Sequence, residues 1–390
     1  MDKVRMGIIG IGNMGSGHLS NIIAGKCPEI AVTAVCDINP ERLSWAKEKT
    51  EGKAACFTDA VKMMDSGLID ACLIAVPHYS HPKLAIEALG RGIHVMCEKP
   101  AGVYTKAVRE MNEAAKKSNA KFGMMFNQRT DCIYRKMREI VQSGKLGKIR
   151  RTNWIITNWY RPQAYYDSGA WRATWSGEGG GVLLNQCPHN LDLWQWICGM
   201  PKTVTAHLYY GKWHDIEVED DVTAFVEYEN GATGSFITTT GDAPGTNRFE
   251  ITLDGGKLLA ENGKLLVTEL DEPEPEFSKT NSRPFGMPSC KTYEAQTDGL
   301  SEQHVGVLNR FAASILRGEQ MVAGGEEGIN GLLISNAMHL SSWLGKTVEI
   351  PFDEDLFYAE LMKRVANSRR KEFFEGSVAD LTNTYNTGKP

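Results

Sequence analysis

A glycine-rich segment near the N-terminus constrains the fold of this chain more than any other feature. The residues Gly10-Ile11-Gly12-Asn13-Met14-Gly15 follow the apolar run Val4–Ile9 and begin a helical pattern. In such a segment the first glycine allows a tight turn, the second lets a pyrophosphate approach the backbone, and the third lets helix and strand pack closely. The spacing therefore predicts a dinucleotide-binding turn, with Gly10, Gly12, Asn13, Met14 and Gly15 as contacts.

An acidic residue follows at the expected place. Asp37 ends the predicted strand Ala31–Cys36, about 20 residues beyond the last glycine. Its carboxylate can accept hydrogen bonds from a ribose 2′-hydroxyl and would repel a 2′-phosphate. No arginine follows it directly, so we expect NAD, with NADP as the alternative. Asp37 could instead only cap the helix that starts at Pro40.

Strands and helices alternate over the first third of the chain. This alternation is typical of a parallel sheet with helices on both faces, so we expect a doubly wound α/β Rossmann domain over residues 1–127. Further strands are predicted at Ala71–Val76, Ile93–Cys97 and Lys121–Phe126, and helices at Asn13–Ala24, Pro40–Lys49, His81–Arg91 and Thr105–Ser118.

The pattern changes after residue 127, where strands succeed one another with hairpin turns between them. We expect residues 128–390 to form a second α/β domain around a large, open, mainly antiparallel sheet, ending in a helical tail. Its strands are predicted at Ile149–Asn158, Val204–Tyr210, Val222–Tyr228, Ala232–Thr240, Arg248–Asp254 and Lys264–Thr268. Helices are predicted at Cys132–Val141, Val182–Ile197, Glu302–Arg317 and Glu326–Leu344, and a loop at Asp271–Ser289.

Two other segments carry chemistry. Glu98-Lys99-Pro100 follows a predicted strand and so lies at the carboxyl edge of the sheet, where such folds bind ligands. Lys99 there can bind a substrate hydroxyl, or it can be an ordinary solvated lysine. The second segment, Gly179–Asp192, is predicted to place Asn185, His189 and Asp192 on one helix face, a pattern that suits proton transfer or a merely capped helix.

Together these segments resemble the glucose–fructose oxidoreductase/inositol dehydrogenase (Gfo/Idh/MocA) family. The resemblance covers essentially the whole chain. It rests on the glycine turn, Val76-Pro77 with His81, Glu98-Lys99-Pro100, Trp171-Arg172 and the Gly179–Asp192 cluster.

The resemblance implies roles for several residues. Lys99 and His189 would be the active-site pair, and a cis Lys99–Pro100 bond would fix the lysine. Cofactor contacts are expected from Pro77, His81, Glu98, Lys99, Asn127, Trp171 and Arg172, besides the glycine turn and Asp37.

The chain departs from the family pattern at two positions. Many relatives have Asp where this chain has Asn185, and often Asn where it has His78. An amide can orient a hydroxyl but cannot accept its proton, so acid–base chemistry falls to His189 and Lys99.

We therefore expect an NAD(P)-dependent dehydrogenase of a secondary alcohol on a sugar, glycoside or cyclitol. His189 would act as the acid/base, with Lys99 and Asn185 assisting. Two alternatives stay open: cleavage of a glycoside through transient oxidation and elimination, and a non-catalytic dinucleotide-binding regulator. The substrate contacts are expected to be Lys99, Tyr160, Arg161, Tyr166, Asn185 and His189, although the aromatic residues can equally be core.

Composition narrows the kinds of partner and the cellular location that we expect for this protein. The formal net charge of −5 and the lack of a long basic run argue against nucleic acid as a partner. No apolar stretch reaches the ~18 residues of a membrane helix, and the 9 scattered cysteines suit a reducing cytoplasm. No metal-ligand spacing is present. We expect a cytoplasmic homodimer or homotetramer.

Overall fold

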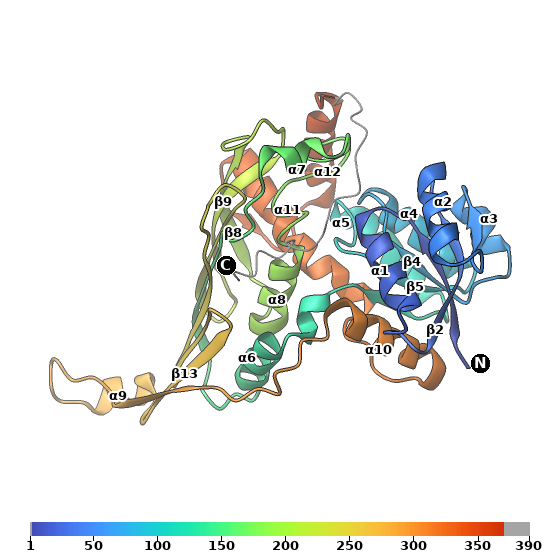
Figure 1. The fold of residues 1–390 in the computed structure, drawn as a ribbon. Coiled ribbons are helices and arrows are strands. Elements are labelled where there is room, and N and C mark those ends of the chain that lie inside the picture. The colour runs from blue at the N-terminus through green and yellow to red at the C-terminus, as the bar shows by residue number, and fades with distance from the viewer. Residues whose placement is uncertain (1, 370–390) are drawn as a thin grey trace.

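A parallel sheet of six strands occupies the first third of the chain (Figure 1). The computed structural model describes residues 2–369. The strand order is β3-β2-β1-β4-β5-β6, so the chain winds outward from β1 in both directions, as predicted for a doubly wound fold. The strands are β1 Val4–Ile9, β2 Ile30–Cys36, β3 Ala55–Phe57, β4 Ala71–Ile74, β5 His94–Cys97 and β6 Phe122–Met124.

Helices cover both faces of this sheet. Strands β4 and β5 are almost wholly buried, as strands of such a sheet must be when helices lie on either side. The helices are α1 Asn13–Ile23, α2 Pro40–Lys49, α3 Ala60–Asp65, α4 Ser80–Gly90 and α5 Thr105–Lys116. The short elements β3 and α3 were not predicted.

The rest of the chain is organised around a nine-stranded sheet, in the order β14-β13-β12-β11-β7-β10-β9-β8-β15. All neighbours pair antiparallel except β7 and β10, which are parallel, so the sheet is mixed. Its strands are β7 Ile149–Ile156, β8 Thr203–Tyr210, β9 Glu219–Glu227, β10 Thr233–Thr239, β11 Asn247–Leu253, β12 Gly256–Glu261, β13 Lys264–Leu270, β14 Cys290–Glu294 and β15 Val348–Glu349.

Only one face of this sheet is covered. In β9, Val222, Ala224 and Val226 are buried, whereas Thr223 and Phe225 between them are exposed. The covering layer lies on one side of the sheet in Figure 1, and the opposite side is open. Its helices are α6 Cys132–Gln142, α8 Pro188–Cys198 and α11 Gly328–Leu344, with α12 Glu354–Ala366 packed against α11.

One late helix returns to the first sheet. Helix α10, Gln303–Arg317, places Val307, Leu308 and Phe311 in the same buried cluster as Met6 and Ile8 of β1. The polypeptide therefore contributes to the core beneath the glycine turn from a point far beyond residue 127.

Two expectations about local structure are wrong. Residues 182–187 form turns rather than helix, and α8 begins only at Pro188. The segment Asp271–Ser289, expected as loop, contains helix α9, Glu274–Thr280, and leads into β14; this arm projects from the body in Figure 1. The polar end of the tail, from residue 370, lies outside the described residues.

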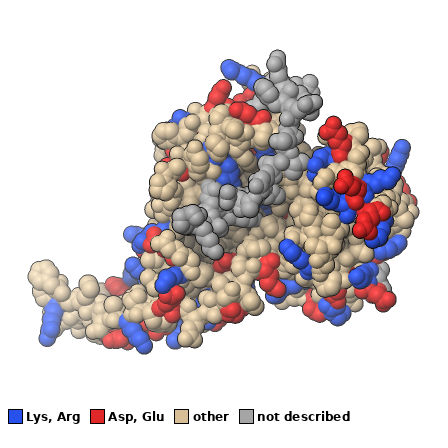
Figure 2. Space-filling model, in the orientation of Figure 1, with Lys and Arg blue, Asp and Glu red and all other residues tan. Residues whose placement is uncertain are grey.

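Hydropathy and charge can be followed in the part of the chain that the structure describes. None of its helices has the length and apolarity needed to cross a bilayer. On the face drawn in Figure 2, basic and acidic side chains of the described residues are interspersed. Within residues 2–369 no group of three or more potential ligands gathers as a metal site.

Candidate active site

The glycine turn has the geometry that its sequence predicts. Gly10 has a φ of +89°, and a Cβ at Gly15 would lie 1.8 Å from the carbonyl oxygen of Gly10. At Gly12, the N-cap of α1, an added Cβ would meet nothing within 4 Å. Open space therefore borders the backbone at the positive end of α1, which fits a dinucleotide pyrophosphate.

Asp37 lies against this turn. Its Oδ2 accepts a hydrogen bond from the backbone N–H of Ile11 at 2.6 Å, and its Oδ1 accepts one from Asn39 at 2.8 Å. The side chain of Asn39 caps α2, so helix capping is not the role of Asp37. Arg42 reaches the turn as well, since its Nε donates to the carbonyl oxygen of Ile11 at 2.7 Å.

The loop after β4 is tied to the segment that carries Lys99. Pro77 is exposed, whereas His81 is buried with its ring nitrogens each 2.7 Å from a backbone carbonyl oxygen, one of Val76 and one of Pro100. Burial lowers the pKa of His81. His81 therefore braces the loop from inside the protein.

Lys99 points toward the second domain. The Lys99–Pro100 bond is cis, as the resemblance implies. The ammonium Nζ donates to the backbone carbonyl of Asn185 at 2.9 Å, so Lys99 is not a solvated surface residue. Burial lowers the pKa of Lys99, while the charges of Glu98 and Glu178 oppose that shift.

Glu98 faces the opposite way, into the Rossmann core. Its Oε1 lies 2.6 Å from Nε2 of His18 on α1, and its Oε2 accepts the backbone N–H of Lys99 at 3.1 Å. Burial alone would raise the pKa of this carboxyl group, but the hydrogen bond and charge of His18 hold it at about 2.

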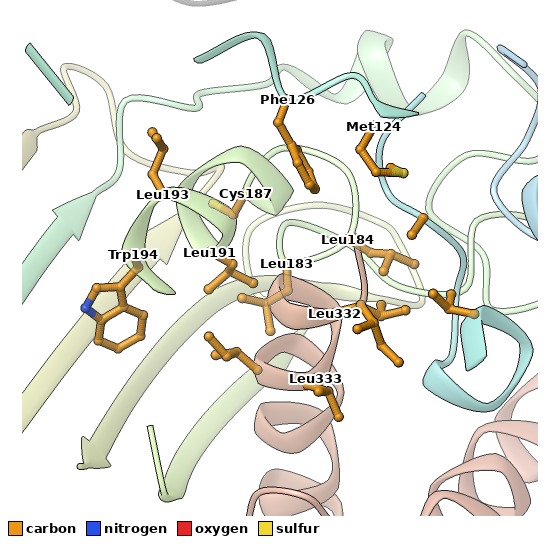
Figure 3. Packing of buried hydrophobic residues seen from close by; sticks show 14 of the residues in the cluster. Met124, Phe126, Leu183, Leu184, Cys187, Leu191, Leu193, Trp194, Leu332 and Leu333 are labelled. Carbon is orange, nitrogen blue, oxygen red and sulfur yellow. The ribbon is translucent and has the colours of Figure 1, made fainter. Parts of the chain in front are cut away.

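The turn over residues 182–187 is built by long-range contacts. One carboxylate oxygen of Glu219, from β9, accepts the N–H groups of Gly181 at 2.9 Å and Leu183 at 3.0 Å. Leu183 and Leu184 pack toward Leu332 of α11 (Figure 3). Asn185 is therefore on a turn, and the prediction that it shares a helix face with His189 is wrong.

His189 lies in the first turn of α8 and is only 3% exposed. Burial, and then the positive charge of Lys99, lower its pKa well below the usual value. Its Nδ1 is buried with no hydrogen-bond partner among the described residues. Asp192 does not assist it, because both of its oxygens bind the buried guanidinium of Arg129, at 2.7 and 2.8 Å.

Aromatic and basic residues of the segment 159–172 gather near Asn185. The hydroxyl of Tyr165, on α7 (Gln163–Asp167), is 3.4 Å from Oδ1 of Asn185 and accepts a hydrogen bond from Arg172 at 2.8 Å. The guanidinium of Arg161 lies 5.2 Å from the centre of the Tyr165 ring. Trp171 meets the ring of buried His78 edge-on, at 5.6 Å.

The surroundings of three further residues that were predicted as substrate or cofactor contacts are as follows. Tyr166 is buried with its hydroxyl donating to Thr240 at 2.7 Å, and Tyr160 is 43% exposed. Asn127, in the short helix Asn127–Thr130, is fully buried and donates to the side chain of Gln303 on α10.

Four residues around the site were not among the predicted contacts. Glu178 and Tyr165 touch Asn185, while His18 and Glu219 hold the segments of Lys99 and Asn185. Glu178 directly precedes Gly179, so an acidic residue at the entry of a glycine turn was the available signal. His18 and Glu219 have no such local signal.

Comparison with known families matches both parts of the chain. The family described as "Oxidoreductase family, NAD-binding Rossmann fold" matches residues 4–126. The family described as "GFO/IDH/MocA C-terminal domain" matches residues 134–259.

Individual relatives agree with the family matches. The chain is 24% identical to myo-inositol 2-dehydrogenase of Thermotoga maritima over 86% of this chain and 95% of that protein. It is 30% identical to D-glucoside 3-dehydrogenase of Escherichia coli over 58% of this chain and 68% of that protein.

A solved structure is also similar. The WlbA dehydrogenase of Bordetella pertussis, in complex with NADH and UDP-GlcNAcA, superposes with a TM-score of 0.76 at 25% identity, covering 90% of this chain and 99% of that one.

Proposed function

Because the chain belongs to the GFO/IDH/MocA oxidoreductase family and carries its NAD-binding Rossmann domain, we propose that it oxidises a secondary alcohol of a sugar, glycoside or cyclitol. The observation that carries this proposal is the placement of buried His189 within electrostatic reach of Lys99, which itself binds the backbone of Asn185. Such a cluster has the groups that alcohol oxidation requires: a proton acceptor and a cation for the oxygen.

The cofactor would be held by the Rossmann residues. The pyrophosphate would lie against the backbone at Gly12, Asn13 and Met14, and the free lone pairs of Asp37 would accept the adenosine ribose hydroxyls. Asp37 supports NAD over NADP, because its carboxylate repels a 2′-phosphate. Bound NAD supplies the hydride acceptor of the reaction.

The chain's own residues would accept the proton of the substrate hydroxyl. A lowered pKa keeps the His189 imidazole neutral at physiological pH, so it can take the hydroxyl proton. We assign this proton to Nε2, since Nδ1 is enclosed by protein. The Lys99 ammonium stabilises the developing alkoxide, and the Asn185 amide orients it.

The substrate would lie between Lys99 and the segment 159–172. Names of the relatives support this class, since they include dehydrogenases of an inositol and of glucosides. The ring of Tyr165, with Arg161 and Arg172 beside it, offers an apolar face and hydrogen-bond donors, as a polyhydroxylated ring requires. Tyr165 thus replaces Tyr166 as the tyrosine that we expect to face the substrate.

The proposal is tested by incubating the purified protein with NAD and a panel of cyclitols, aldoses and glycosides. NADH absorbance and carbohydrate products are followed together. We expect stoichiometric NADH and a keto product from at least one compound, with NADP a poorer cofactor. Glycoside cleavage without net NADH would replace this proposal with the transient-oxidation reaction. NAD binding without turnover of any compound would contradict both.

We also propose that the open face of the nine-stranded sheet joins copies of the chain. Phe225 of β9 is 46% exposed there and Leu266 of β13 is 36% exposed, and exposed apolar side chains on an open sheet face commonly mark contacts with a second copy. Light scattering is expected to give the mass of a dimer or tetramer. The substitution Phe225→Glu is expected to lower that mass, and a monomeric wild type would contradict the proposal.

A further inference from the structure

The reason why the carboxylate of Glu178 is buried in the site has not yet been explained. Glu178 is 2% exposed and, among the residues that the structure describes, forms no ion pair with a basic side chain. Burying a carboxylate without such a partner opposes folding. The contacts of Glu178 therefore indicate what the charge is used for.

Both oxygens of Glu178 are fixed. Oε2 accepts the backbone N–H of Ala173 at 2.6 Å, and Oε1 accepts the side-chain amide N–H of Asn185. Since a carboxylate only accepts hydrogen bonds, it determines which end of the Asn185 amide faces it. The Nδ2 atom must point to Glu178, so Oδ1 points the other way, toward the hydroxyl of Tyr165.

The charge of Glu178 also reaches Lys99. Its negative charge favours the Lys99 ammonium, whereas those of Arg161 and Arg172 oppose it. The other nearby carboxylate, Glu98, is already paired with His18. The ionisable groups that act on Glu178 itself are Arg172 of its own loop, Lys99 after β5, Tyr165 and Tyr166 of α7, and Glu219 of β9.

We propose that Glu178 is a positioning residue of the acid–base site. It holds the Asn185 amide with its oxygen toward the substrate, and it supplies beside Lys99 the negative charge that an aspartate at position 185 would have supplied directly. This inference rests on the proposed dehydrogenase reaction, in which Asn185 and Lys99 meet the substrate oxygen.

The test moves the negative charge between positions 178 and 185. Glu178→Gln removes the charge, Asn185→Asp places two carboxylates in contact, and the double variant returns one carboxylate at position 185. We expect each single variant to lose about 10- to 100-fold in kcat, by analogy with the loss when the hydrogen-bond partner of a metal ligand is removed. The double variant is expected to recover most of that loss, with the KM for NAD unchanged throughout.

A second readout does not need turnover. The rate at which acetic anhydride modifies Lys99, followed by peptide mass spectrometry against pH, reports the pKa of its ammonium. In Glu178→Gln that pKa is expected to fall, because a favourable negative charge is lost, and in the double variant it is expected to return. A structural role alone would not move it.

The matched control is Glu217→Gln. The carboxylate of Glu217 accepts the backbone N–H of Trp175 at 3.2 Å, so it holds the same loop as Glu178 without touching Asn185. We expect it to leave kcat and the Lys99 titration unchanged. An unchanged Lys99 titration in Glu178→Gln, or a double variant no better than the single ones, would overturn the inference. If the acetylation result holds while no alcohol is oxidised, only the proposed function fails.

Discussion

The carboxylate of Glu98 and the imidazole of His18 form a buried pair, with Oε1 2.6 Å from Nε2. The pair joins the segment of Lys99 to helix α1, which begins at the glycine turn. The glycine turn, where we propose that the pyrophosphate binds, and the segment of Lys99 are thus connected by a buried contact inside the Rossmann core.

The first prediction concerns this pair. His18→Leu leaves the Glu98 carboxylate buried and unpaired, and is expected to lower the free energy of unfolding by about 3–5 kcal/mol at pH 7. Because the pKa of Glu98 is held at about 2, its contribution is complete above pH 4.5 and is lost as the pH falls toward 2. Urea denaturation at several pH values measures both effects.

The variant and wild type are expected to converge at low pH, where Glu98 becomes protonated and needs no partner. Lys53→Ala, which breaks an exposed pair with Glu51, is the control and is expected to leave the free energy of unfolding nearly unchanged. A loss in His18→Leu as small as that of the control would mean that the buried pair is not a stabilising contact.

The second prediction separates cofactor binding from folding at two glycines. Gly12→Ala is expected to fold with an unchanged Tm, because its Cβ meets no protein atom within 4 Å, yet to weaken NAD binding at least about tenfold. Gly15→Ala places a Cβ 1.8 Å from the carbonyl oxygen of Gly10 and is expected to lower Tm as well. Thermal melts and NADH titration distinguish them. Normal NAD affinity in Gly12→Ala would place the pyrophosphate elsewhere.

The third prediction concerns pH. The proposed reaction needs neutral His189, whose pKa is lowered, and protonated Lys99, whose pKa also lies below its ordinary 10.5. The rate is therefore expected to fall at acidic pH as His189 gains a proton, and at alkaline pH, below 10.5, as Lys99 loses one. Profiles of kcat/KM against pH measure both limits.

Substitutions assign those limits. His189→Ala is expected to lose ~10²–10⁴ in kcat, and Lys99→Arg to move the alkaline limit upward because a guanidinium keeps its proton. NADH binding, followed by protein fluorescence, controls for loss of the cofactor site. Retention of the full rate in His189→Ala would assign the proton transfer to another group.

The fourth prediction tests cofactor choice. Asp37→Asn removes the negative charge and keeps an acceptor for only one of the two backbone N–H groups, those of Ile11 and Asn39, that the carboxylate binds. The KM for NADP is expected to fall about tenfold or more relative to that for NAD. Glu41→Gln, a charge removed in the first turn of α2, is the control. An unchanged ratio in Asp37→Asn would show that another group excludes the 2′-phosphate.

The Rossmann elements could be predicted because their signals are local. Apolar runs mark β1, β4 and β5, and the glycine spacing reports a turn whose sterics depend on residues close in sequence. The turn before α8 could not be predicted in this way. Its residues have helical spacing. However, Glu219, which lies 36 residues beyond Leu183, accepts hydrogen bonds from backbone N–H groups there.

The same distinction applies to the site. Lys99, Asn185 and His189 belong to recognisable motifs, whereas His18 and Glu219, which hold the segments of Lys99 and Asn185, come from elsewhere in the chain. Asp192 has the spacing of a partner for His189, yet the nearby guanidinium of Arg129 binds it instead. A spacing shows which residues share an element, but it does not show which of two partners a carboxylate meets in three dimensions.

Helix α10 has a consequence for dissecting this protein. Because Val307, Leu308 and Phe311 complete the apolar cluster against β1, a fragment ending at residue 127 would expose that surface to water. Truncation would thus remove part of the nucleotide-binding half together with the catalytic half. The two halves are expected to unfold as one cooperative unit, so ligand binding at the glycine turn would protect the distal sheet from proteolysis.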